Sequence, residues 1–183
     1  ISRYDAPLPQ PESFEVYPNR DSYPFMAEYR FEPHWKVRDF VRGTIRLNGW
    51  ADAWTPEVRE VGTRAGPAGD ARLTEMSDRF WRENSYGGED DPDRVVLFVS
   101  LKAEKAGRPV WHRTWALDAW GDVRGTAMSR LVSVPVALAV ESVLNREIPA
   151  GVHAAPHDPR LVTRWLEEVG HLAQYMRRVD HLV

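Results

Sequence analysis

Two runs rich in β-branched and aromatic residues, at positions 94–104 and 109–120, most constrain how this chain can fold. A short polar connection containing Gly107 separates them. Valine, threonine and aromatic residues favour extended strands, and glycine supplies the positive φ that a tight hairpin turn requires. The pair therefore predicts one long antiparallel β-hairpin, on which the remaining elements must pack.

The elements around this hairpin mix strands with helices. Strands are expected at 14–17, 39–47 and 174–182, the last at a sheet edge, and helices at 52–61, 71–82, 126–145 and 158–169. Residues 1–11, 62–70 and 86–93 show no regular pattern and are expected to be a lead-in, a loop and a connector. This order predicts an α+β fold with a mixed, largely antiparallel sheet and helices packed on one face. The length fits a single domain over residues 1–183.

The segment 126–145 is apolar on nearly every side, which predicts a buried helix. Thr126 is placed to cap its first turn. Pro135 predicts a kink, because proline removes one backbone hydrogen bond. Thr126, Ser129 and Ser133 share one face at three- and four-residue spacing. Their hydroxyls either approach a ligand or a neighbouring backbone, or bond back to carbonyls of the same helix.

Composition excludes several classes of function. The net charge of -3 and the lack of a basic run argue against a nucleic-acid or anionic-membrane partner. The absence of cysteine excludes disulfides and thiolate metal sites and fits a reducing, cytoplasmic setting. The longest apolar run, 131–140, is too short to span a bilayer. His153 and His157 are four residues apart, but a proline intervenes and no third ligand is evident, so no metal site is expected.

Motifs for independent catalysis are missing. The sequence has no G-x-G-x-x-G, no Walker loop and no G-x-S-x-G, so we expect no nucleotide cofactor on this chain and no reaction catalysed by it alone. The first residue is Ile1 rather than methionine, and a polar lead-in follows it. We interpret this start as the boundary of a fragment.

Tryptophan is unusually frequent, with eight residues that include Trp35, Trp50 and Trp54 in one segment and Trp111, Trp115 and Trp120 in another. Packing in a core or an interface is the favoured interpretation, because large aromatic side chains contribute most to such contacts. A tryptophan-lined ligand cleft is the alternative.

The segment 17–22, YPNRDS, concentrates hydrogen-bond donors and acceptors at a strand end. Arg20 can hold a carboxylate through two parallel hydrogen bonds, with Asn19 and Ser22 completing the recognition. Alternatively, Arg20 and Asp21 form an ion pair that only stabilises the turn.

The segment 41–47, VRGTIRL, is the second polar candidate. Arg42 and Arg46 point the same way along a strand, and Gly43 lets a ligand or a backbone approach closely. A solvated sheet face is the alternative. Together, the two arginine-bearing segments fit a substrate with several carboxylates, such as an amino-acid conjugate.

Three segments in order, YPNRDS (17–22), RGTIRLNGW (42–50) and GTAMSRLVSVPVALAVESVLNREIPAGV (125–152), carry a family resemblance. With them, the chain resembles the C-terminal, non-Rossmann domain of the saccharopine dehydrogenase family from about Tyr17 onward, weakly over 61–93. Saccharopine reductases of that family use NADPH to reduce an imine between an aldehyde and glutamate, and a separate Rossmann domain holds the cofactor. The present sequence departs from the family at Leu47, usually aromatic, and at Ser133 or Val134, usually small.

The resemblance implies a substrate-binding and dimerisation domain of an NAD(P)-dependent oxidoreductase that acts on a carboxylate-bearing amine or imine. It assigns substrate binding to Arg20, Arg42, Gly43 and Thr44, with Asn19 as a further candidate. The implied partners are a second copy of the chain, the missing Rossmann domain and a small carboxylate-bearing substrate. The alternative is a non-catalytic module that only forms homodimers.

Overall fold

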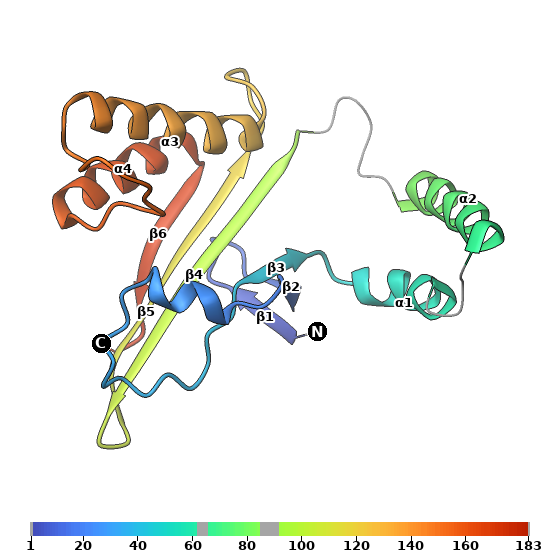
Figure 1. Ribbon diagram of the computed structural model, residues 1–183, viewed down its shortest axis with the longest axis horizontal. Helices are drawn as coiled ribbons and strands as arrows, with labels where there is room; N and C mark the ends of the chain where they lie inside the picture. Colours follow the sequence, from blue (N-terminus) through green and yellow to red (C-terminus); the bar gives the residue numbers. More distant parts are fainter. Residues whose placement is uncertain (1, 62–65, 85–91, 183) are drawn as a thin grey trace.

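The computed structural model describes residues 2–61, 66–84 and 92–182, which form two three-stranded antiparallel sheets and several helices (Figure 1). The small sheet contains β1 (Ser2–Ala6), β2 (Glu12–Pro18) and β3 (Gly43–Arg46) in that order. The large sheet contains β4 (Arg94–Lys105), β5 (Arg108–Trp120) and β6 (Tyr175–Asp180) in that order. The predicted α+β class is confirmed, with two antiparallel sheets in place of one mixed sheet.

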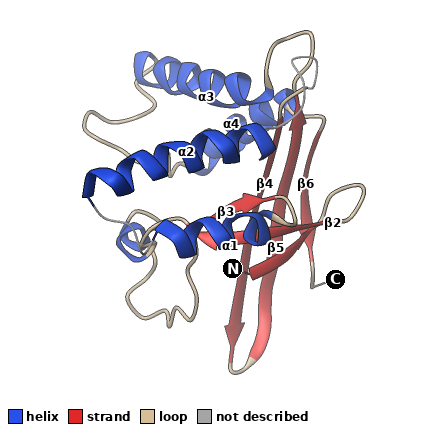
Figure 2. Cartoon of the chain, turned by 90° about the vertical axis from the view of Figure 1, so that its right-hand side faces the viewer, coloured by secondary structure: helices blue, strands red, loops and turns tan. Residues whose placement is uncertain are grey.

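The helices are η1 (Tyr23–Ala27, a short 3-10 helix), α1 (Trp50–Val61), α2 (Gly66–Asn84), α3 (Ala127–Leu144) and α4 (Pro159–Leu172). Helices α3 and α4 lie together at one end of the large sheet, whereas α1 and α2 extend away from the sheets (Figure 1). The strands of the small sheet cross those of the large sheet steeply (Figure 2). Packing on one face of the large sheet is thus observed for α3 and α4.

The predicted hairpin is confirmed as β4 and β5, which pair from Arg94↔Trp120 to Lys105↔Arg108. Ala106 and Gly107 form its two-residue turn, and both have positive φ, 50° and 74°. This geometry matches the right-handed twist of the flanking strands. Strand β6 pairs with β5 from the other side and is an edge strand, as predicted.

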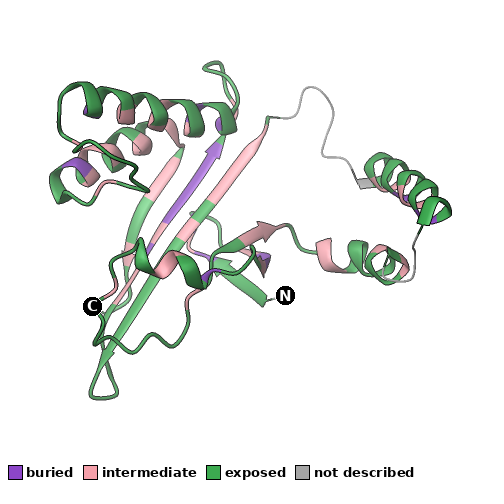
Figure 3. Ribbon diagram, viewed as in Figure 1, coloured by how far each residue is buried: buried purple, intermediate pink, exposed green. Residues whose placement is uncertain are grey.

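Residues 114–119 of strand β5 are buried or half-buried on both faces of the sheet, toward which successive side chains of a strand alternately point. Ala116 packs with Phe14 in a core shared with the small sheet. Leu117 and Ala119 pack with Ala127 in a second core beneath α3 and α4. Figure 3 shows the resulting buried stretch along β5. The central strand therefore joins the two halves of the molecule.

The prediction of a buried helix at 126–145 is wrong for one whole side of α3. Its buried residues are only Ala127, Arg130 and Ser142, while Val136 and Val140 remain 59% and 54% exposed. The sheet end and α4 cover one side, and no other described element covers the opposite one. By length and composition alone α3 could span a membrane, a test that core helices of soluble proteins also pass.

Several element boundaries differ from the predictions. Residues 66–70 belong to α2 rather than to a loop, since Pro67 suits the first turn of a helix. The lead-in contains β1, which pairs along β2. Strand β3 is shorter than the predicted 39–47, and α4 continues past Gly170 to Leu172. Residues 62–65 and 85–91, part of the predicted loop and connector, lie outside the described residues.

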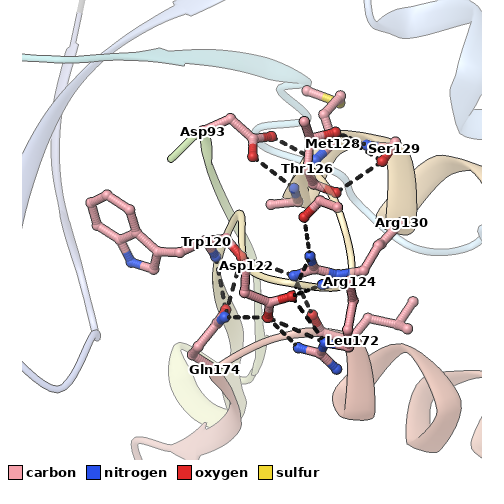
Figure 4. A network of polar contacts seen from close by, with 12 residues as sticks. Asp93, Trp120, Asp122, Arg124, Thr126, Met128, Ser129, Arg130, Leu172 and Gln174 are labelled. Atoms are coloured by element: carbon pink, nitrogen blue, oxygen red, sulfur yellow. Dashed lines mark hydrogen bonds and ion pairs between the residues drawn. The ribbon is translucent and has the colours of Figure 1, made fainter. Parts of the chain in front are cut away.

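A buried guanidinium ties β5, α3 and α4 together (Figure 4). Arg130 of α3 donates to the Asp122 carboxylate at 3.0 Å, to the Trp120 carbonyl at 2.8 Å and to the Leu172 carbonyl at 3.3 Å. Arg124 also binds Asp122 through its side chain and its backbone amide. These contacts, the Arg124 hydrogen bonds first, lower the pKa of Asp122 to about 2.

We therefore predict that Asp122→Asn lowers the urea midpoint of unfolding at neutral pH. The folded-state pKa lies below the unfolded one, so the ionised carboxylate stabilises the fold above the unfolded pKa. This contribution is lost as the pH falls toward about 2, so the difference between wild type and variant should shrink on acidification. Asp39→Asn, in an exposed loop, is the control and should leave the neutral-pH midpoint unchanged. A difference that stays constant with pH would contradict this role of Asp122.

Candidate functional site

The pairing of β2 with β3 brings the two polar segments together. Tyr17 lies opposite Thr44, and Pro18 lies opposite Gly43. Just beyond the paired residues, the amide of Asn19 donates to the carbonyl of Arg42 at 2.8 Å. Segments more than twenty positions apart in sequence thus share one end of the small sheet.

The turn after β2 is held by its own polar groups. The Asp21 carboxylate accepts a hydrogen bond from the amide of Tyr23 at 3.0 Å. The hydroxyl of Ser22, a buried residue, accepts one from the amide of Arg42 at 3.0 Å. Ser22 thereby fastens the two segments to each other. Asp21 bonds the backbone here, and no Arg20–Asp21 ion pair occurs among the described residues.

The guanidinium groups of Arg20 and Arg42 are both exposed. Arg20 has a left-handed backbone, with φ of 60°, at the tip of the turn. Arg42 lies over the ring of Phe25, 3.8 Å from its centroid, a contact that orients the cation without using its hydrogen-bond donors. Neither side chain binds a carboxylate within the described part of the chain.

Gly43 is needed for packing within the small sheet. A Cβ atom at this position would fall far inside contact distance of Cγ1 of Val16. Val16 is itself buried, so it has little room to move. The close approach that the sequence predicted at Gly43 is therefore made by a side chain of β2. Thr44, next in the strand, is half-buried.

Glu15 positions α1, a role that sequence inspection did not reveal. Its carboxylate on β2 accepts hydrogen bonds from the amides of Gly49 at 2.9 Å and Ala51 at 2.7 Å. Backbone amides at a helix start favour the charged form, so these bonds lower the pKa of Glu15. The first turn of α1, with Trp50, is thereby fixed against β2.

Aromatic rings line a pocket between β2 and α1. The ring of Tyr17 stacks on that of Trp50, with centroids 5.0 Å apart and planes inclined by 16°. Trp54 lies one turn further along α1, and its ring packs against that of Phe80 in α2, with the ring centroids 4.2 Å apart. The pocket has a volume of about 500 Å³ and is lined by Tyr17, Trp50, Ala51, Trp54, Thr55, Val58 and Arg59. None of the eight tryptophans is buried; Trp50 and Trp54 line this pocket, and their rings also pack on Tyr17 and Phe80.

Carboxylates occupy the starts of three helices. Asp93 accepts from the amides of Ala127 and Met128 at the start of α3, at 2.7 and 2.8 Å. Asp158 does the same for α4, as Glu15 does for α1. A dinucleotide pyrophosphate needs free amides at such a position. The starts of α1, α3 and α4 therefore do not fit a pyrophosphate, because carboxylates already accept hydrogen bonds from their amides.

Other polar candidates are engaged locally. Thr126 caps α3 by accepting from the amide of Ser129, as predicted. The Ser129 hydroxyl bonds the Thr126 carbonyl at 3.0 Å, and the Ser133 hydroxyl bonds the Ser129 carbonyl at 2.7 Å. The hydroxyl stripe therefore bonds back to its own helix. The ring of His153 contacts the Pro149 carbonyl, and no metal-binding group of three side chains occurs in the described ranges.

The fold and the site define an α+β domain with a polar turn at the end of its small sheet and an aromatic pocket beside it, and carboxylates cap the starts of α1, α3 and α4. A family model described as "Saccharopine dehydrogenase C-terminal domain" matches residues 2–172. The chain belongs to this family, which makes it an oxidoreductase-related domain. No solved structure matches the chain.

We predict that Gly43→Ala destabilises the fold by about 1–3 kcal/mol, the usual cost of overpacking a tight site. The double variant Gly43→Ala/Val16→Ala should lose less stability than the sum of the two single changes, because Val16→Ala removes the clashing methyl group. Gly170→Ala in α4 is the control, since its Cβ meets only the Met176 sulfur at an ordinary 3.7 Å. Urea unfolding of the four variants tests this. Additive losses would contradict the proposed clash.

Proposed function

We propose that the chain is the substrate-recognition and dimerisation domain of a saccharopine dehydrogenase-like, NAD(P)-dependent oxidoreductase of the cytoplasm. Its substrate is a small amine or imine that carries carboxylate groups. Arg20 anchors one carboxylate, and Arg42 with Thr44 binds a second polar group, while Asn19 and Gly43 shape the turn and the strand around them.

The observation that carries this proposal is the state of the two arginines. Their segments are fastened together by the Asn19 and Ser22 hydrogen bonds, yet both guanidiniums are exposed and have no carboxylate partner among the described residues. Two exposed arginines without internal carboxylate partners favour a carboxylate-bearing ligand. Ion pairs within the sheet would instead have favoured a purely structural turn.

Hydride transfer needs a second domain in this proposal. The sequence lacks the glycine-rich strand–turn–helix of dinucleotide sites, and the carboxylate caps compete with phosphate at α1, α3 and α4. NAD(P) therefore binds a separate Rossmann domain, and the present chain supplies substrate contacts.

For the recognition role we predict that Arg20→Ala weakens binding of an N-carboxyalkyl glutamate at least about tenfold, as expected for loss of a charged hydrogen bond of about 1.5–3 kcal/mol. Amide NMR titration of the chain measures the effect. Arg30→Ala is the matched control, because Arg30 is also exposed with a left-handed backbone. Equal affinities of wild type and Arg20→Ala would remove the anchoring role.

The dimerisation role is proposed from the uncovered side of α3. Its exposed apolar side chains are Met128, Val132, Val136, Val140, Val143 and Leu144. They line a continuous stripe with a shallow hollow of about 300 Å³ near its C-terminal end. Strand β4 adds Leu97, Val99 and Leu101 on the face where α3 packs, about half exposed each.

A second copy of the chain suits this surface. A stripe of this kind has no charge to select a different partner and can pack on its own symmetry mate. Stable dimers bury about 800 Å² per subunit, which needs a surface wider than one helix, and β4 extends it. The same surface favours homodimers even if the domain binds no substrate, so dimerisation and recognition are tested separately.

We predict that the chain sediments as a dimer and that Val136→Lys/Val140→Lys makes it a monomer, since the new charges would be buried without partners. Val123→Lys is the control, because Val123 is fully exposed outside the helix. Sedimentation velocity over a concentration series provides the measurement. A wild-type monomer, or an unchanged dimer in the double variant, would contradict the proposed interface. Co-flotation with phosphatidylcholine vesicles would assign the stripe to a bilayer instead.

A further inference from the structure

The aromatic pocket between β2 and α1 has walls that are fixed in place. The Glu15 carboxylate holds the first turn of α1, so Trp50 is stacked against Tyr17 by two anchored elements. Trp54 is supported from behind by Phe80. The volume of the pocket, about 500 Å³, lies within the usual range of about 300–1,000 Å³ for small-molecule sites. Flat π-faces of this kind favour a flat ligand.

Two arginines lie at the pocket. Arg59 lines it and has no ion-pair or hydrogen-bond partner in the described ranges. Arg46 lies beside Tyr17, and its guanidinium donates to the phenol oxygen at 3.4 Å; it pairs with no carboxylate of the described residues. Of the nearby acids, Glu57 is paired with Arg79, Glu60 with Arg72 and Glu15 with backbone amides, whereas Asp52 is exposed and does not line the pocket.

We propose that this pocket binds a small molecule with a flat aromatic or unsaturated body and one anionic group. The flat body stacks on Trp50 and Trp54, and Arg59 holds the anion. The site differs from the Arg20–Arg42 turn in its residues and in its chemistry, because there the proposed ligand is recognised through polar contacts alone. The inference does not rest on the oxidoreductase role.

The test uses 3-phenylpropionate as the probe and the indole N–H signals of the whole 183-residue chain as the readout. We expect saturable shifts of the Trp50 and Trp54 signals, assigned through single substitutions, with a dissociation constant on the order of a millimolar for so small a ligand. The neutral 3-phenylpropanamide should bind about tenfold more weakly, because it lacks the charge held by Arg59. Cyclohexanepropionate, which keeps the charge without the flat ring, should also bind more weakly.

Variants then assign the two halves of the site. Trp54→Leu and Arg59→Gln should each weaken binding of the probe about tenfold or more. Trp81→Leu on α2 and Arg160→Gln on α4 are the matched controls, both exposed and outside the pocket, and should bind like wild type. Trp54→Phe serves if Trp54→Leu unfolds, and should retain most of the affinity.

Equal binding of the acid and the amide, or unchanged binding in Arg59→Gln, would overturn the assignment of the anion site. Shifts confined to tryptophans other than Trp50 and Trp54 would overturn the pocket itself. Arg20→Ala should leave this titration unchanged. If Arg20→Ala does not weaken binding of the glutamate conjugate, only the carboxylate-anchoring proposal fails. If the probe does not bind at Trp50 and Trp54, only the pocket proposal fails.

Discussion

The burial of β5 on both faces is the interaction on which the rest of the structure depends. Ala116 faces the small sheet, and Leu117 and Ala119 face α3 and α4, so one strand contributes to both cores. Small side chains at two of these three positions let both layers approach the backbone closely. The Arg130 guanidinium then closes the end of this strand by bonding the Trp120 carbonyl and the Asp122 carboxylate. Strands β4 and β6 also reach both cores, but among the described residues β5 is the strand that contributes fully buried side chains to each.

Strand β2 plays the corresponding role for the candidate sites. On one side it pairs with β3 and so joins the Asn19–Ser22 turn to Arg42. Through Glu15 it also fixes the start of α1, and with it the aromatic pocket. The proposed arginine site, at the end of β2, and the proposed aromatic site, beside it, are thus neighbours in the fold. In the aromatic pocket, Tyr17 belongs to a strand and Trp50 to a helix whose start Glu15 holds, an arrangement that favours specific binding.

Much of the candidate site was readable from sequence because its cues are local. The YPNRDS and RGTIR segments are chemically dense, and their strand character predicted that they lie in a sheet. The sequence did not determine which contact each of these side chains makes. Gly43 faces Val16, and Ser22 serves as an acceptor for the Arg42 amide. Glu15 gave no signal, since a lone glutamate within a strand resembles any solvent-exposed one, and its partners lie over thirty positions away.

The sequence by itself determined the class of fold, the hairpin, the cap of α3 and the absence of a dinucleotide loop, because each follows from the types and local order of the residues. The tertiary structure decided the rest. It split the strands into two sheets, since pairing depends on contacts between distant segments. It also left one side of α3 uncovered. An apolar side chain has the same composition whether its own chain or a partner buries it, so only the arrangement in space distinguishes a core helix from an exposed one.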